Sequence, residues 1–149
     1  LLSNSGMNLP RRSIADIARG RPFFGSVLMT GSHTASIEKV ANGEADVASI
    51  DCVTAAVFRH HRPGIMGRIR ILASSVPSPV LPFVTSSSTD ERAAAILREC
   101  LASMPGNREG REACAGILIR GFAALGESDY RPILHHQDEA ARLGYPELR

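Results

Sequence analysis

The sequence predicts an α/β protein in which a mostly parallel sheet is followed by a helical C-terminal segment. Short apolar runs alternate with stretches of helical spacing over about the first 85 residues. Parallel strands need a crossover connection, which is usually a helix, so this alternation is typical of βαβ units. Roughly the last 60 residues carry helical spacing almost throughout. The hydrophobic content of 44% and charged content of 21% are ordinary for a globular protein.

Charge and hydropathy argue against a nucleic-acid-binding protein and against a protein with a membrane-spanning helix. The 17 basic and 15 acidic residues leave a formal net charge of +2, which provides no electrostatic footprint for nucleic acid. No apolar run of about 18 residues is present, so we expect no membrane-spanning helix. The opening residues lack the basic region of a signal peptide, and the chain reads as a piece of something longer.

The three cysteines, Cys52, Cys100 and Cys114, form no CxxC pair. A zinc site or a thioredoxin-like motif therefore has no support. The favoured interpretation is three small apolar core residues. A bridge between Cys100 and Cys114 is the alternative, if their backbones approach within about 7 Å.

The first elements follow from turn residues and spacing. Pro10 suits the first turn of a helix, where its missing N–H is not needed, and Gly20 ends that helix. The apolar run at residues 26–30 predicts a strand. A second helix, which carries Ile37, stops at Asn42-Gly43.

The middle of the chain repeats the pattern. Residues 46–51 predict a second strand, 53–61 a helix that ends before Pro63, and 68–72 a third strand with alternating polar and apolar residues. A fourth short strand follows at 82–85. The proline-rich stretch at residues 74–82 is the best candidate for a boundary or hinge.

The C-terminal part predicts three helices. The first covers about residues 90–104, with Ser88 and Glu91 at the spacing of a capping box. Pro105-Gly106 breaks it. The second helix covers roughly residues 109–124 and the third roughly 130–143.

Two loops are candidates for an anion site. Ser3-Asn4-Ser5-Gly6 and Thr30-Gly31-Ser32-His33 each supply hydroxyl groups and a glycine ahead of a predicted helix. Helix N-termini attract anions because their first N–H groups lack partners and the helix dipole is positive there. The alternative for either loop is that its Ser or Thr is a plain N-cap.

A longer motif begins at the second loop. Residues 30–52 read TGSHTASIEKVANGEADVASIDC. This stretch resembles the solute-binding subunits of phosphate/phosphite/phosphonate ABC transporters, which carry a similar (T/G)-G-S-H…S…V-A-x-G-x-A-D-x-A-x-x-D pattern. The loop at residues 3–6 is similar to the Ser-rich turn of that family, and residues 79–84 and 144–148 add weaker matches. The resemblance covers nearly all of the chain.

The resemblance implies a type II periplasmic-binding fold, in which two α/β lobes hold a ligand in the cleft between them. Residues 1–76 would form the ligand-binding lobe without its first strand, and residues 77–149 a crossover strand and helices of the other lobe. A small set of side chains would bind the anion and, through a carboxylate, a ligand amine: Ser3, Asn4, Ser5, Thr30, Ser32, His33 and Asp51. Asn4 stands where phosphonate binders commonly have Thr, and Asp51 has the alternative role of a helix N-cap.

The expected function is therefore that of a periplasmic binding protein, not an enzyme, which delivers a phosphate-like oxyanion to an inner-membrane ABC permease. No cofactor or metal is expected, because adjacent histidines such as His60-His61 rarely chelate one ion on a helix. A sensory domain of the same fold is the alternative function, and an enzyme that uses Cys52 as its nucleophile is a more distant one. We also expect a homodimer or a strand-swapped oligomer, because unpaired strands favour association.

Overall fold

The computed structural model describes residues 3–149, and within them the chain is helical without any strand. Its contacts group the chain into two units, which we call the first unit (residues 3–78 and 130–149) and the second unit (Pro79–Asp129). The boundary after Ser78 falls inside the proline-rich stretch. The predicted division after residue 76 stays a prediction. No helix in the described part is long and apolar enough to cross a membrane.

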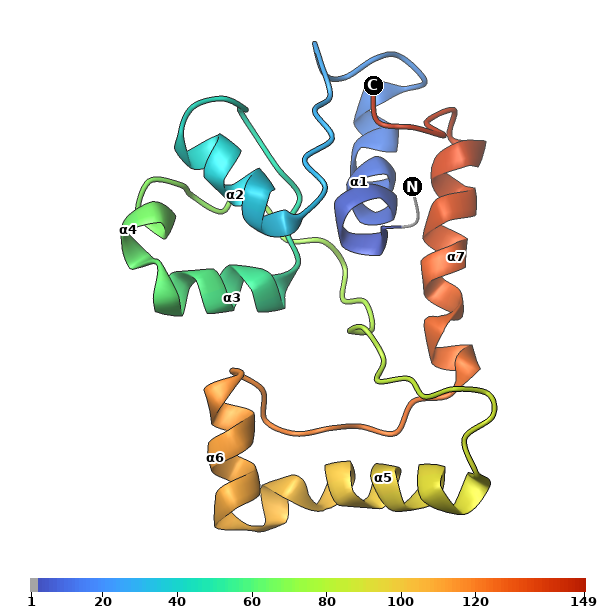
Figure 1. Ribbon diagram of the computed structural model, residues 1–149. Coiled ribbons are helices and arrows are strands. Elements are labelled where there is room, and N and C mark those ends of the chain that lie inside the picture. Colours follow the sequence, from blue (N-terminus) through green and yellow to red (C-terminus); the bar gives the residue numbers. More distant parts are fainter. Residues whose placement is uncertain (1–2) are drawn as a thin grey trace. The chain divides into compact units, whose positions relative to one another are not determined.

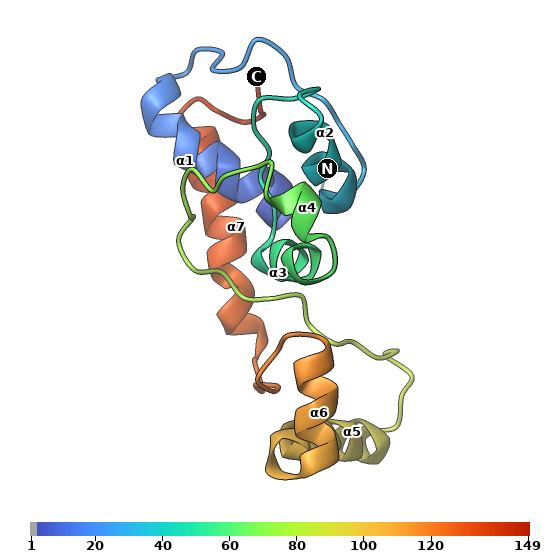
Figure 2. The same ribbon diagram turned by 90° about the vertical axis from the view of Figure 1, so that its left-hand side faces the viewer.

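The first unit contains a pair of helices that lie side by side (Figures 1 and 2). A π-helical turn, η1 (Asn4–Asn8), leads into α1 (Leu9–Ala18), and α7 (Glu127–Arg142) enters this unit at Tyr130. Arg12 Nε lies 2.7 Å from Glu139 Oε2 and joins the two helices. This hydrogen-bonded pairing lowers the pKa of the Glu139 carboxyl.

Near the C-terminus, Tyr145 is fully buried in the first unit. Tyr145 packs against Ala15 and Ala18 of α1. Its hydroxyl donates a hydrogen bond to the carbonyl of Arg149 and accepts one from the Arg149 N–H. The same carbonyl accepts from the N–H of Phe24 at 3.1 Å. The chain end is thus tied to the segment that follows α1.

Three more helices of the first unit surround a second apolar cluster. They are α2 (His33–Ala41), α3 (Cys52–His61) and α4 (Pro63–Met66). Ile37, Phe58 and Met66 form the buried centre of the cluster, one from each helix. Figure 1 shows the three helices grouped together beside α1. Their packing fixes the direction of the N-termini of α2 and α3.

The second unit consists of α5 (Glu91–Ser103), a 3₁₀ turn η2 (Met104–Gly106) and α6 (Arg108–Gly116). Only Gly110 and Cys114 of this unit are buried. A Cβ atom on Gly110 would come within 2.0 Å of the carbonyl oxygen of Met104. Gly110 therefore allows α6 to approach η2 closely. Phe83 and Phe122 form an edge-on ring pair with centroids 5.2 Å apart.

The predicted α/β class with a mostly parallel sheet is wrong for the described residues, which are helical and contain no strand. The two-lobe arrangement that the resemblance implies stays a prediction. The four predicted strands at residues 26–30, 46–51, 68–72 and 82–85 lie in irregular connecting segments. A strand exists only where a neighbouring strand pairs with it, and these segments make no such pairs with one another. Their apolar side chains remain exposed, as Leu28 at 58% and Ile71 at 67% show.

The predicted helices are confirmed, with changes at some of their ends. The helix from Glu91 is capped by Asp90, whose carboxylate accepts from two backbone N–H groups, so the predicted capping box of Ser88 is wrong. The helix expected at 109–124 stops at Gly116. Leu118 follows with a left-handed φ of 59°, which a helix does not accommodate.

The cysteines differ in their surroundings. All three are free, and Cys114 is buried as predicted. Cys52 and Cys100 are exposed, so for them the prediction of core residues is wrong. Cys52 occupies the first position of α3 and is not part of the buried cluster around Phe58.

Candidate functional site

Three helices of the first unit begin with a side-chain cap. Ser3 Oγ accepts from the Gly6 N–H at 3.0 Å ahead of η1, and Ser32 Oγ accepts from the Ala35 N–H at 3.1 Å ahead of α2. Asp51 Oδ1 accepts from the Thr54 N–H at 2.8 Å ahead of α3. The N-cap alternative for these residues is thus confirmed. A capping hydroxyl still has its own O–H to donate, so capping does not exclude contact with an anion.

The N-termini of these three helices come together through one side chain from each. Ser5 Oγ lies 2.9 Å from His33 Nε2, and His33 Nε2 lies 3.5 Å from Asp51 Oδ2. The side chains of His33 and Asp51 remain 24% and 30% exposed. We call Ser5, His33 and Asp51 the N-terminal cluster. It is partly open to solvent and positioned by η1, α2 and α3.

The N-terminal cluster does not have the geometry of a serine–histidine–aspartate relay. A serine–histidine–aspartate relay needs the hydroxyl on one ring nitrogen of histidine and the carboxylate on the other. Here Ser5 and Asp51 both approach Nε2 of His33. The carboxylate therefore cannot hold the tautomer in which Nε2 takes the proton of Ser5.

Opposing effects set the charge state of Asp51. Partial burial raises the pKa of its carboxyl, but hydrogen bonds from Thr54 and the nearby His33 outweigh burial, and the net pKa lies below its ordinary value. Asp51 is therefore ionised at neutral pH. A carboxylate beside an imidazole and a hydroxyl offers a ligand both acceptors and donors of hydrogen bonds.

Two predicted site residues make their hydrogen bonds with residues outside the N-terminal cluster. The side-chain amide of Asn4 donates to Ser78 Oγ at 2.7 Å, and Asn4 Oδ1 is buried without a hydrogen-bond partner. The Thr30 hydroxyl donates to the carbonyl of Ser32 at 3.1 Å and lies 2.6 Å from Ser36 Oγ. Thr30 thus stabilises the turn ahead of α2, and no contact links it to His33.

Two serines that were not predicted from the sequence support this region. Ser49 Oγ donates to the backbone carbonyl of Ser5 at 2.6 Å and ties η1 to the segment ahead of α3. Its position two residues before Asp51 was a usable signal, because alternate residues of an extended segment share a face. Ser78, the partner of Asn4, lies in the proline-rich stretch, and nothing in its local pattern indicates this contact.

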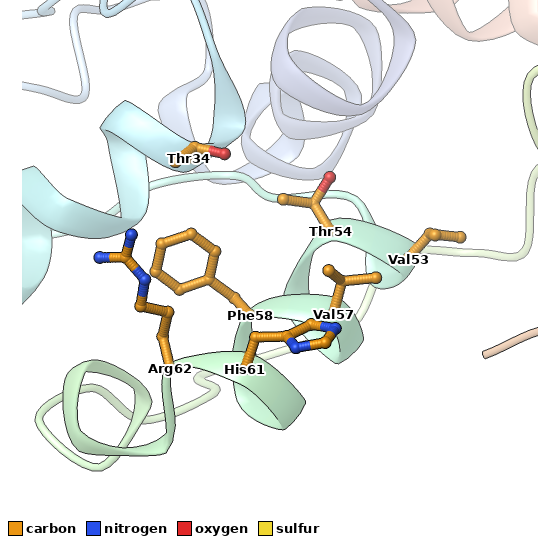
Figure 3. A pocket seen from close by; sticks show the side chains of 7 residues that line it. All are labelled: Thr34, Val53, Thr54, Val57, Phe58, His61 and Arg62. Carbon is orange, nitrogen blue, oxygen red and sulfur yellow. The ribbon is translucent and has the colours of Figure 1, made fainter. Parts of the chain in front are cut away.

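A cavity of about 390 Å³ lies next to the N-terminal cluster, between α2 and α3. Figure 3 shows Phe58 at its centre, with the hydroxyl groups of Thr34 and Thr54 on one side and Arg62 on another. The Arg62 guanidinium lies 6.0 Å from the centre of the Phe58 ring. Thr34 directly follows His33 in the sequence, and the Thr54 N–H donates a hydrogen bond to Asp51 Oδ1. None of the predicted site residues lines this cavity.

The described residues bring no three His, Cys, Asp or Glu side chains together as a metal site would require. His60 and His61 contact each other edge-on, with ring centroids 4.8 Å apart.

Comparison with known proteins agrees with the resemblance of the sequence motif. The model of one family, described as ABC transporter, phosphonate, periplasmic substrate-binding protein, matches residues 1–130. The match includes all residues of the N-terminal cluster and ends at Tyr130, so most of α7 lies beyond it. No curated protein matches the chain.

Proposed function

We infer the function from the family: the chain belongs to the periplasmic substrate-binding proteins of phosphonate ABC transporters. Membership implies a small ligand, an ABC permease as partner and an extracytoplasmic location. Proteins of this kind generally bind their ligand without changing it chemically. We propose that this chain binds a phosphate-like oxyanion, such as phosphate, phosphite or a phosphonate, at the N-terminal cluster.

The observation that carries this proposal is the convergence of three helix N-termini on His33. Each N-terminus contributes a partial positive charge and N–H groups that lack intrahelical partners. One helix end alone is a weak anion site, whereas three ends with a hydroxyl and an imidazole form a concentrated set of donors. The distances of 2.9 Å and 3.5 Å about His33 Nε2 support the proposal, because they bring the three side chains close together.

Each side chain of the N-terminal cluster has a distinct role in the proposal. Ser5 donates its O–H to an oxygen of the ligand, and His33 donates from Nε2 when that nitrogen carries a proton. The carboxylate of Asp51 binds the amine of an aminophosphonate. Outside the cluster, Ser3 and Ser32 hold the loops ahead of η1 and α2 in place and present their own hydroxyls.

Asn4 and Thr30 act at the edge of the site in this proposal. Asn4 Oδ1, which is buried without a partner, accepts a hydrogen bond from a ligand or from water. Thr30 keeps the Ser32 loop in shape through its contacts with Ser32 and Ser36. The interlobe cleft that the family resemblance implies stays a prediction.

Isothermal titration of the protein with methylphosphonate, phosphite, phosphate and sulfate tests the proposal. We expect heat from at least one of the phosphorus oxyanions, and we expect His33→Ala to raise its Kd about tenfold or more, since hydrogen bonds to charged groups contribute about 1.5–3 kcal/mol. His60→Ala is the matched control, because His60 is exposed on α3 away from the N-terminal cluster.

Two results would contradict the proposal. The absence of heat from all four anions excludes an oxyanion ligand. Equal loss of affinity in His33→Ala and His60→Ala excludes the N-terminal cluster as the place of binding.

A further inference from the structure

The cavity between α2 and α3 lies outside the N-terminal cluster, and its lining combines an apolar floor with a few polar groups. The side chains of Val53, Val57 and Phe58 form the floor. The hydroxyl groups of Thr34 and Thr54 lie on one side of it (Figure 3). Sites for small molecules usually have this composition, and a volume of about 390 Å³ lies within their usual range of about 300–1,000 Å³. The cavity is therefore a candidate for a second binding site.

The charge at this cavity is positive. Arg62 and His61 belong to its lining, whereas none of the seven lining residues is an aspartate or a glutamate. Arg62 forms no ion pair within the described residues, and its guanidinium lies 6.0 Å from the centre of the Phe58 ring. A guanidinium keeps its charge in proteins and can donate two parallel hydrogen bonds to a carboxylate. Arg62 thus offers a fixed cation at the edge of an apolar floor.

The neighbouring charges also favour an anion. Residues 52–89, which include the whole of α3 and α4, contain four arginines and no aspartate or glutamate. Asp51 precedes this stretch, but its carboxylate already accepts a hydrogen bond from a backbone N–H and lies beside His33. Glu38 of α2 is not part of the cavity lining. An anion beside Arg62 therefore meets no lining carboxylate that would repel it.

We propose that this cavity binds a small organic anion with a compact apolar body, such as an aromatic carboxylate. The carboxylate pairs with Arg62, and the apolar body packs against Val57 and Phe58, which removes its surface from water. Thr34 and Arg62 are exposed, so a ligand can enter the cavity from solvent. A site with one ion pair and an apolar floor selects organic anions over phosphate and sulfate, because these inorganic ions have no apolar surface to bury.

The organic anion and the oxyanion of the proposed function use different side chains, so this inference goes beyond the proposed function. The oxyanion contacts Ser5 and His33, whereas the organic anion contacts Arg62 and the apolar floor. The two places are neighbours, because Thr34 directly follows His33 at the start of α2. They share no side chain, however, so the loss of one kind of binding does not require the loss of the other.

Isothermal titration of the protein with benzoate tests the inference, and benzyl alcohol serves as a neutral ligand with the same ring. We expect saturable heat from benzoate and a Kd at least about tenfold higher for benzyl alcohol, because the alcohol cannot form the ion pair. For the same reason we expect Arg62→Gln to raise the Kd of benzoate about tenfold or more. Arg59→Gln is the matched control, because Arg59 is exposed on α3 and does not line the cavity.

Nuclear magnetic resonance of ¹⁵N-labelled histidines locates the bound benzoate. The ring resonances of His61 should move with benzoate concentration, and those of His33 should stay in place. Saturation of the protein with methylphosphonate should leave the Kd of benzoate unchanged, because the two ligands contact different side chains. Circular dichroism checks that Arg62→Gln keeps its helices.

The inference is overturned if benzoate gives no saturable heat, or if benzyl alcohol binds as tightly as benzoate. Equal loss of affinity in Arg62→Gln and Arg59→Gln also overturns it, because the cavity would then not be the place of binding. A benzoate-dependent shift at His33 with none at His61 does the same. None of these results decides the outcome of the oxyanion titrations, which use other ligands and the His33→Ala variant.

Discussion

The two units of the chain have different sources of stability. The first unit has two buried clusters, one around Tyr145 and one around Ile37, and hydrogen bonds tie its C-terminal end to the segment after α1. In the second unit only Gly110 and Cys114 are buried, and apolar side chains such as Ile96 and Leu97 are 51% and 52% exposed. The candidate site lies in the unit that has the larger buried core.

This difference explains where a precise arrangement of side chains is possible. The N-terminal cluster depends on the directions of η1, α2 and α3, and buried residues such as Ile37 and Phe58 fix two of these helices. Helices without a buried face have no comparable constraint, because most helical stability in proteins comes from packing of an apolar face. A mutation should therefore have a large effect in the first unit and a small one on the exposed face of the second.

Among the tests of this comparison, replacement of Tyr145 should change the free energy of unfolding the most. Tyr145 is fully buried, and Tyr145→Ala removes a ring from the cluster with Ala15 and Ala18 and both hydrogen bonds to Arg149. We expect a loss of about 3–5 kcal/mol in the free energy of unfolding, as for other large aromatic truncations. Leu97→Ala in the second unit should cost less than about 0.5 kcal/mol.

Urea denaturation followed by circular dichroism measures both variants. The comparison between the units fails if Leu97→Ala destabilises the protein as strongly as Tyr145→Ala. Tyr145→Phe serves as a further control, because it keeps the ring and removes only the hydroxyl.

Gly110 provides the sharpest test within the second unit. A methyl group at this position would overlap the backbone of Met104, so Gly110→Ala forces α6 away from η2. We expect a loss of about 1–3 kcal/mol, typical of overpacking, whereas Gly116→Ala meets open space and should have little effect. Loss of helical circular dichroism at a lower temperature in Gly110→Ala, compared with Gly116→Ala, is the expected result. Identical melting curves would show that the close approach of α6 and η2 contributes nothing.

For Asp51, in the first unit, we expect a smaller contribution to the free energy of unfolding, and this contribution depends on pH. The folded-state pKa of its carboxyl lies below the unfolded value of about 3.9. Ionised Asp51 therefore stabilises the fold at pH values above the unfolded pKa, and this contribution disappears as the pH falls through the folded pKa. Asp51→Asn keeps an N-cap and removes the charge, whereas Asp51→Ala also removes the cap and should cost about 1 kcal/mol at neutral pH.

The measurement is the free energy of unfolding of wild type and Asp51→Asn between pH 7 and the lowest pH at which the protein remains folded. The stability of wild type should fall more steeply below about pH 4 than that of Asp51→Asn. Parallel curves for the two proteins would show that the ionised carboxylate adds no stability at this site.

The sequence predicted the helices because their signals are local. Pro10, Gly20 and the Asn42-Gly43 pair mark helix ends through their own backbone preferences, and the structure has helices that end where these residues predict. The strands could not be predicted in the same way. The apolar pattern of residues 26–30 is compatible with a strand, but a strand also needs a partner, and the segment does not contain that information.

The candidate site shows the same limit. Composition of the two loops indicated Ser5 and His33, and the family resemblance indicated Asp51, so the sequence named all members of the N-terminal cluster. The spacing of these residues in the sequence did not show that Ser5 and Asp51 approach the same nitrogen of His33. That arrangement depends on how η1 and α3 are placed. The contact between Asn4 and Ser78 spans 74 residues and had no local signal.

The central claim is that an oxyanion binds at the N-terminal cluster, and the ring nitrogens of His33 report on this most directly. In a ¹⁵N nuclear magnetic resonance titration with the phosphorus oxyanion that gives heat, the Nε2 resonance of His33 should move with ligand concentration. The resonances of His60, His61, His135 and His136 should stay in place. A shift at any of these other histidines with none at His33 would contradict the account, because the ligand would then bind elsewhere on the protein.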